Sequence, residues 1–278
     1  MNQTLTPQSF ATQASLAPRL SLPSGPALCP LIMAGDPNLD TTRHLLARCV
    51  AEGVAMVELC LPFRNAFTDG ATLQHAHARA LQQEASLQAV LQLVAEFSSR
   101  IKIILLADSS HTLRPLGIEQ VLQQAAAAGV AGVLPHGLPP RLGESFQEAA
   151  RQAGLPVVGT IYANATPETR RQVLGQTTAF LYLVSTYGRS GGAVEPSDLK
   201  CQIDALRAHT PCPIALGFGL RSPGDVGRAF DAGSDIAIVG SAVAGQVEAA
   251  LKTGGCPIAS AGDFIAALQK EAHDRRPA

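Results

Sequence analysis

The sequence predicts a single domain of the α/β class, a (β/α)8 TIM barrel. Short apolar runs alternate with longer helical segments, the alternation repeats eight times, and it extends over roughly 250 residues, the usual length of this fold. A doubly wound open sheet is the competing arrangement, but no glycine fingerprint follows the first expected strand. We expect a weakly ordered N-terminal arm over residues 1–26 and a barrel with a C-terminal helix over residues 27–278.

Each expected element follows from its local pattern. The strands are apolar runs typical of parallel strands buried on both faces: Cys29–Met33, Val54–Leu61, Ile101–Ala107, Val130–Leu134, Val157–Ile161, Ala179–Val184, Ile214–Gly217 and Ile236–Val239. The expected helices are Leu39–Ala51, Leu73–Glu84, Leu87–Phe97, Ile118–Ala128, Leu142–Ala153, Thr166–Leu174, Pro196–His209, Pro223–Ala232, Ser241–Leu251 and Gly262–Ala272. Glycines 129, 154 and 233 each follow a helix, where glycine supplies the left-handed residue that ends it.

Composition narrows the class of protein. The chain has 278 residues, of which 46% are hydrophobic, so it can bury a large core. The net charge of -1 gives no indication of a nucleic-acid partner or an anionic membrane surface. No apolar run reaches about 18 residues, and the N-terminus lacks the pattern of a secretory signal. The six cysteines show no C-x-x-C pair, which favours reduced thiols in a cytoplasmic protein.

The second expected strand carries the first candidate for chemistry. Glu58 interrupts its apolar run, and Asp69 follows eleven residues later on the loop after the strand. Two carboxylates in different environments can have separated pKa values, so that one exchanges protons while the other stays charged. The structural alternative is a core glutamate paired with a distant arginine and an aspartate that caps the next helix.

Glycine-rich loops follow the last three expected strands. In a barrel these loops lie at the C-terminal face with the catalytic residues, and the loops after strands 7 and 8 can bind phosphate through backbone N–H groups and a helix N-terminus. The residues that we expect around a phosphate are Gly191, Gly219, Gly240 and Ser241. The alternative is that these glycines only form tight turns between strand and helix.

Several stretches resemble the tryptophan synthase α chain family, in order and with matching gaps from about residue 27 to 272. They are Ile32–Pro37, Glu58–Phe63, Asp69–Gln74, Leu181–Ser185, Gly217–Pro223 and Val239–Val243. The resemblance implies a lyase that cleaves indole-3-glycerol phosphate to indole and glyceraldehyde 3-phosphate, without a metal or an organic cofactor. It implies that Glu58 is the acid/base, that Asp69 binds the indole N–H, and that Tyr182 lies beside them as a third catalytic residue.

Departures from the family pattern concern the substrate pocket and the partner surface. The expected pocket residues, three of which replace the family's usual ones, are Leu31, Ala107, His136 and Phe218. The family pairs with a pyridoxal-phosphate β chain, but Asn65 and Ala66 replace the acidic residue and the proline of the contact loop, which leaves this partnership open. Two alternatives therefore remain. One is a stand-alone lyase or aldolase for a different 3-substituted glycerol phosphate, and the other is a weakly catalytic subunit that partners a pyridoxal-phosphate β-type chain.

Other polar residues give weaker indications. His136 could act as an acid or base, although a lone loop histidine is more often polar lining. His75 and His77 lie two apart on an expected helix, point to different sides and make a poor metal pair. We therefore expect no metal site.

Overall fold

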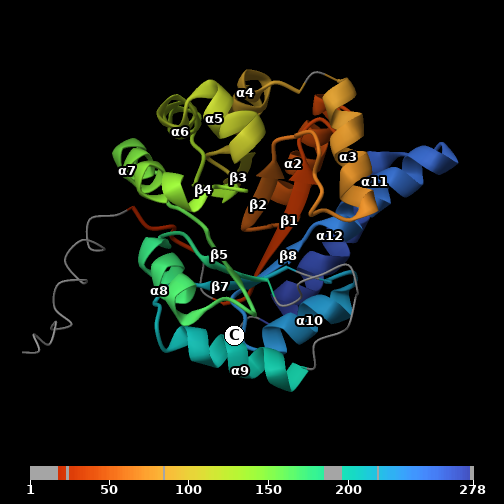
Figure 1. The fold of residues 1–278 in the computed structure, drawn as a ribbon. Helices are drawn as coiled ribbons and strands as arrows, with labels where there is room; N and C mark the ends of the chain where they lie inside the picture. Colours follow the sequence, from red (N-terminus) through yellow and green to blue (C-terminus); the bar gives the residue numbers. More distant parts are fainter. Residues whose placement is uncertain (1–17, 23–24, 84, 185–195, 218, 276–278) are drawn as a thin grey trace, which may run out of the picture.

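The computed structural model describes residues 18–22, 25–83, 85–184, 196–217 and 219–275. Eight parallel strands form one sheet in the order β4-β3-β2-β1-β8-β7-β6-β5. They are β1 (Ala27–Met33), β2 (Met56–Cys60), β3 (Lys102–Asp108), β4 (Gly132–His136), β5 (Gly159–Tyr162), β6 (Leu181–Val184), β7 (Ile214–Leu216) and β8 (Ile236–Val239). Figure 1 shows these strands at the centre of the molecule.

Backbone contacts between β4 and the segment before β5 close the barrel. Val133 forms an isolated parallel bridge with Val157. The Val133 N–H donates to the Pro156 carbonyl at 2.8 Å, and the Val158 N–H donates to the Val133 carbonyl at 2.9 Å. The first and last strands of the sheet order are therefore joined, and the predicted (β/α)8 barrel in one domain is confirmed.

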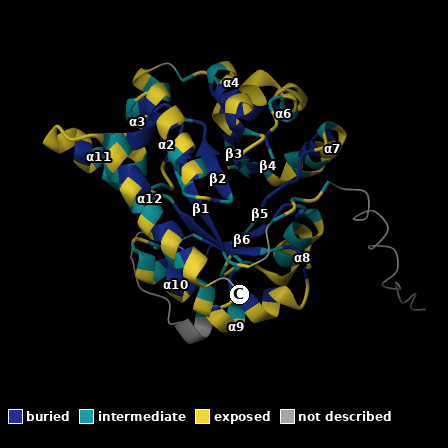
Figure 2. Cartoon of the chain, turned by 180° about the vertical axis from the view of Figure 1, so that it is seen from behind, coloured by how far each residue is buried: buried dark blue, intermediate teal, exposed yellow. Residues whose placement is uncertain are grey.

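Helices surround the strands. They are α2 (Leu39–Ala51), α3 (Ala71–Gln82), α4 (Leu87–Phe97), α5 (Arg114–Leu116), α6 (Ile118–Ala127), α7 (Gly143–Ala153), α8 (Pro167–Gln176), α9 (Pro196–Arg207), α10 (Pro223–Asp231), α11 (Ser241–Thr253) and α12 (Pro257–Asp274). Figure 2 shows buried residues on the strands and on the inner sides of the helices, with exposed residues outside. None of the described helices is long and apolar enough to span a lipid bilayer.

Local chemistry sets several helix starts. The side chains of Asn38, Ser86, Thr166 and Ser222 each accept a hydrogen bond from a backbone N–H in the first turn of α2, α4, α8 and α10. Such a bond satisfies a donor that has no partner within the helix. The ends of α7 and α11 fall at left-handed glycines, 154 and 254.

Two apolar layers hold the barrel together. One lies inside it, with Cys29, Ile104 and Ile238 among its members, and the other lies between strands and helices, where Leu59, Leu105 and Ala107 belong. Leu20 and Leu22 pack against the inner layer. These two leucines belong to the predicted N-terminal arm, so the described part of that segment contacts the barrel core.

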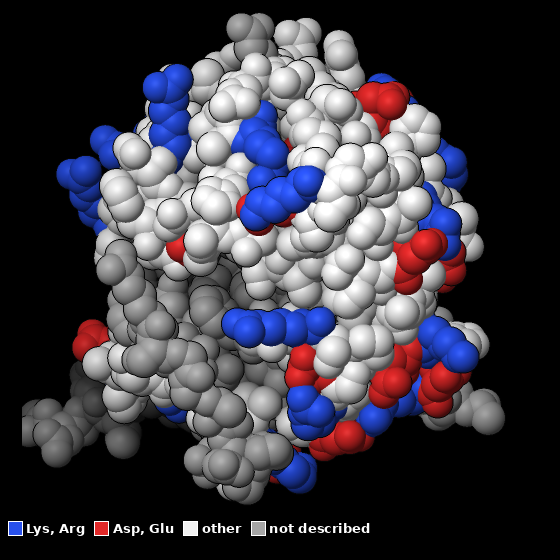
Figure 3. Space-filling view, turned by 90° about the vertical axis from the view of Figure 1, so that its right-hand side faces the viewer, with Lys and Arg blue, Asp and Glu red and all other residues white. Residues whose placement is uncertain are grey.

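The described surface carries charges of both signs. On the face in Figure 3, acidic and basic side chains lie interspersed toward the lower right, and further basic side chains are scattered above them. Several of the charges form pairs, including Lys252 with Glu248 and Arg48 with Asp263. The described residues of this face form no continuous basic patch of the kind that binds nucleic acid.

Candidate active site

Glu58 lies in the middle of β2, in register with Leu31 of β1 and Ile104 of β3. It is 1% exposed, and its Oε2 atom has no hydrogen-bond partner among the described residues. Burial, with a smaller contribution from the charge of Asp69, raises the pKa of Glu58 from its ordinary 4.5 to about 8. Among the described residues, no lysine or arginine pairs with this carboxyl, so they give no support to the interpretation of Glu58 as a structural ion-pair partner.

Asp69 lies on the loop between β2 and α3. Its Oδ2 atom is 3.1 Å from Nε2 of His77, a buried residue of α3. The helix cap is Gly70, with no capping bond from a side chain, so Asp69 is not the cap that the structural alternative assumed. The Asp69 side chain keeps 24% of its surface exposed, which leaves it accessible to a ligand.

Tyr182 of β6 is the third predicted catalytic residue. Burial, followed by the charge of Glu58, raises the pKa of its phenol well above the ordinary 10, so the hydroxyl keeps its proton. A Cβ atom on Gly217 would collide with this hydroxyl and with Ile238. The glycine at the end of β7 thus leaves room for Tyr182 inside the barrel.

A narrow cavity of about 40 Å³ opens beside Asp69. Its lining includes two of the predicted pocket residues, Leu31 and His136, together with Met33, Cys60, Phe63, Asp69, Leu73, His77 and Leu106. The prediction of Ala107 as a pocket residue is wrong: Ala107 belongs to the layer between strands and helices. Side chains alternate along a strand, so the preceding residue, Leu106, faces the cavity with its register partner Cys60.

Of the four predicted phosphate residues, three are described, and they follow β7 and β8. Gly219 follows β7 with φ of 81°, a left-handed conformation that favours glycine. Gly240 precedes Ser241, the first residue of α11, and no side chain caps this helix. A Cβ atom on Gly240 would lie 3.4 Å from Leu31, so the α11 N-terminus borders a cavity-lining residue. Gly191 and Phe218 lie outside the described residues.

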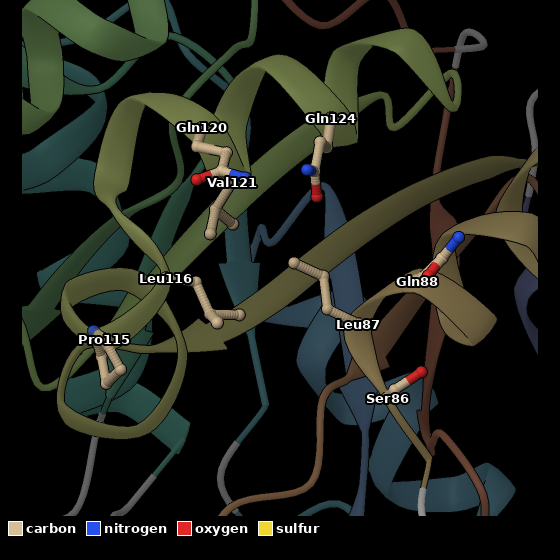
Figure 4. Close-up of a pocket in the computed structure, with 8 residues that line it drawn as sticks. All are labelled: Ser86, Leu87, Gln88, Pro115, Leu116, Gln120, Val121 and Gln124. Atoms are coloured by element: carbon tan, nitrogen blue, oxygen red, sulfur yellow. The ribbon is translucent and has the colours of Figure 1, made fainter.

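A larger cavity lies away from the carboxylates. It measures about 460 Å³ and opens between the start of α4 and the α5–α6 segment, as Figure 4 shows. Leu116 and Leu87 reach into it, and its polar lining side chains are serine and glutamine. A site without a titratable side chain has no group to transfer a proton, so we assign the chemistry to the barrel mouth.

Sequence reasoning missed two histidine contacts at this mouth. His77 was considered only as a metal ligand, yet it bonds Asp69. Asp108, at the end of β3, accepts hydrogen bonds from the N–H groups of Ser110 and His111 and lies 2.7 Å from the His111 ring. The signal for Asp108 is its position, because strand ends of a barrel point polar side chains to the mouth.

The fold and site define a class: a (β/α)8 barrel with a buried, protonatable carboxyl and a second, accessible carboxylate at its C-terminal mouth. Sequence comparison identifies the family within that class. A family model described as "Tryptophan synthase alpha chain" matches residues 19–267. The chain belongs to the tryptophan synthase alpha chain family.

Individual relatives agree with this assignment. The chain is 37% identical over 218 residues to the tryptophan synthase alpha chain of Gloeobacter violaceus, covering 78% of this chain and 79% of the relative. It is 34% identical over 252 residues to that of a Synechococcus species, with 88% and 91% covered. The crystal structure of tryptophan synthase subunit alpha from Legionella pneumophila superposes with a TM-score of 0.82 at 25% identity, covering 90% of this chain and 93% of that one.

Proposed function

We propose that the chain is a carbon–carbon lyase that cleaves indole-3-glycerol phosphate to indole and glyceraldehyde 3-phosphate, a reaction of tryptophan biosynthesis. Family membership supplies the reaction class. The observation that carries the residue assignment is Glu58, a buried carboxyl with a pKa of about 8 and one oxygen that has no partner among the described residues. Such a group is protonated near neutral pH and can therefore donate a proton to a substrate.

The cleavage can be written with one carboxyl group moving both protons. Protonated Glu58 donates its proton to indole C3, and the resulting carboxylate accepts the proton of the adjacent glycerol hydroxyl. The bond between C3 and the glycerol carbon breaks, its electron pair returns to the indole ring, and the hydroxyl carbon becomes the aldehyde. Glu58 ends protonated, so the cycle balances without an oxidant or reductant.

Asp69 and Tyr182 have supporting roles in this scheme. Protonation of C3 leaves a positive charge on the indole nitrogen, and an anionic Asp69 that accepts the N–H stabilises that charge. Asp69 suits this role because, among the described residues, its carboxylate contacts a histidine ring and no lysine or arginine. Tyr182 keeps its phenol proton, so it can donate a hydrogen bond to the substrate beside Glu58.

The phosphate of the substrate would bind at the N-terminus of α11. Backbone N–H groups of the first helical turn and the helix dipole both favour an anion there. Gly240 and Ser241 belong to this turn, and Gly219 and Gly191 complete the proposed site from the preceding loops. Its support is the short distance from Gly240 to Leu31, which brings the phosphate end of a substrate next to the cavity.

A tryptophan synthase β chain is the proposed partner. The loop between β2 and α3 presents Phe67, which is 78% exposed, beside Asp69. Asn65 has φ of 59°, and its carbonyl accepts a 2.8 Å bond from the Phe67 N–H, so the loop is a tight turn with the phenyl ring outside. An exposed aromatic ring is a common anchor of protein interfaces.

A second candidate substrate has one observation in its favour. His136 lines the cavity, and its ring lies 5.3 Å from that of Phe63. An imidazole in the wall can bind a polar ring substituent, which favours a 3-substituted glycerol phosphate other than the indole compound. The same retro-aldol chemistry would apply.

An indole-release assay tests these assignments. The purified chain is mixed with indole-3-glycerol phosphate, with and without a β chain. Release by the chain alone indicates a stand-alone lyase, and release only with the β chain indicates the two-chain enzyme. A folded chain that binds glycerol phosphate but releases no indole in either tube would overturn the substrate assignment.

The unpaired thiols of all six cysteines fit a reducing compartment, for which we propose the cytoplasm.

A further inference from the structure

His77 has both ring nitrogens engaged in a buried position. Its side chain is 3% exposed. The backbone N–H of Phe63 donates to Nδ1 at 3.1 Å, and Nε2 lies 3.1 Å from Oδ2 of Asp69. Because a backbone N–H can only donate, Nδ1 must be the acceptor, and the single proton of the neutral ring is on Nε2. The ring therefore donates from Nε2 to the Asp69 carboxylate.

We propose that His77 is the positioning residue of Asp69, holding its carboxylate in one orientation through a fixed imidazole tautomer. The inference rests on the proposed function, in which Asp69 receives the substrate N–H. A carboxylate has two oxygens, and the bond to His77 uses Oδ2. Oδ1 then remains for the substrate. A neutral donor orients the carboxylate without cancelling its negative charge, which the developing ring cation requires.

The surroundings of the imidazole make this orientation rigid. Phe63, itself 4% exposed, packs against the His77 ring with centroids 4.2 Å apart. Phe63 follows the end of the strand that contains Glu58. The segment that continues from the Glu58 strand thus fixes the His77 ring, and that ring in turn fixes the Asp69 carboxylate.

A second side chain of α3 supports the same loop. Gln74 lies one turn before His77 on the same helix face. Its Nε2 donates to the carbonyl of Ala66 at 3.2 Å and to the carbonyl of Asp69 at 2.8 Å. Gln74 therefore holds the backbone of the loop while His77 holds the carboxylate, so the two contacts are separable by mutation.

Two substitutions at position 77 separate orientation of Asp69 from simple packing. His77→Gln places an amide donor near the position of Nε2 and keeps the bond to Asp69. His77→Asn places an amide oxygen near the position of Nδ1 and keeps the bond from Phe63, but it loses Asp69. We expect His77→Asn to lower kcat roughly 10- to 100-fold with little change in KM, the size of effect that a misplaced group causes. His77→Gln should retain most of the wild-type kcat.

The control variant is His75→Gln. His75 is on the same helix but its side chain is 59% exposed and contacts Glu248, so this substitution should leave kcat unchanged. Equal losses of kcat in His77→Asn and His77→Gln would show a packing role and overturn the proposal. Full kcat in His77→Asn would also overturn it.

Nitrogen-15 NMR of the histidine rings tests the proposal without any turnover. The expected spectrum of His77 shows a neutral ring with its proton on Nε2, and the Asp69→Asn variant should shift that N–H resonance. A proton on Nδ1, or a resonance that Asp69→Asn leaves in place, would refute the inference. If the wild type releases no indole either with or without a β chain, the proposed function fails. The NMR result alone then decides whether His77 orients Asp69.

Discussion

Replacing Glu58 by glutamine should change how the stability of the protein depends on pH. The folded protein holds this carboxyl at a pKa of about 8, against an ordinary value of 4.5. Between these values the folded state keeps a proton that the unfolded state has released. Stability therefore falls as pH rises, by about 1.4 kcal/mol per unit for this group. The whole shift corresponds to about 5 kcal/mol of stability, which is fully present below pH 4.5 and fully lost above pH 8.

Glutamine does not ionise, so Glu58→Gln should not show this loss. We expect the unfolding free energy of Glu58→Gln, relative to wild type, to increase by several kcal/mol from pH 5 to pH 9, measured by urea unfolding followed by circular dichroism. All other titrating groups are common to both proteins and largely cancel in the difference. An exposed carboxylate, Glu119 of α6, gives the control Glu119→Gln, for which the difference from wild type should stay nearly constant. A difference between Glu58→Gln and wild type that stays constant from pH 5 to 9 would refute the raised pKa.

The same variant has a kinetic consequence. Without the carboxyl, the proton transfer to indole C3 has no donor, and kcat should fall roughly 100- to 10,000-fold. The wild-type dependence of kcat/KM on pH should show a group that titrates near pH 8, where Glu58 loses its proton. Full turnover by Glu58→Gln would refute its role as the acid/base.

Three further variants probe the rest of the site. Asp69→Asn should remove most of kcat with the fold intact, because an amide cannot offset the ring cation; unchanged turnover in a steady-state assay would contradict that role. Gly219→Ala should raise KM more than it lowers kcat, because the backbone φ of 81° is strained for any L residue at the place where phosphate would approach. A KM equal to that of the wild type would contradict the assignment of Gly219 to the phosphate site. Gly217→Ala should displace the Tyr182 hydroxyl and lower kcat; a crystal structure with Tyr182 in place would show that the barrel relaxes elsewhere.

Elements with strong local signals were predictable from the sequence. The boundaries expected for α2 and α4 coincide with the structure, because each helix has a capping side chain, Asn38 or Ser86, and an apolar face. The π-helical turn Ser109–Leu113 was not expected. It follows from Asp108, whose carboxylate binds two successive N–H groups, and an aspartate after a strand does not by itself specify that arrangement.

The errors at the site have a common physical origin. Ala107 was assigned to the pocket, and one residue of register exchanges the inner and outer faces of a strand. His77 was discounted because residues two apart on a helix face different sides. That argument correctly separates it from His75, but it says nothing about what each side contacts. The contact with Asp69 depends on how the loop folds back over α3, which a linear pattern does not encode.

The site assigns opposite tasks to two carboxyl groups through their surroundings. Glu58 is buried, and its Oε2 has no partner among the described residues, which favours the neutral acid and makes a proton available. Asp69 is partly exposed and accepts an imidazole N–H, so its carboxylate remains accessible to a substrate N–H. The charge of Asp69 also contributes to the raised pKa of Glu58. If the two groups act as a pair, Asp69→Asn should therefore move the pKa of Glu58 downward, and carbon-13 NMR of the Glu58 carboxyl in that variant would measure it. An unchanged titration would mean that burial alone raises the pKa of Glu58. The two carboxylates would then bind the same substrate without an electrostatic effect of one on the other.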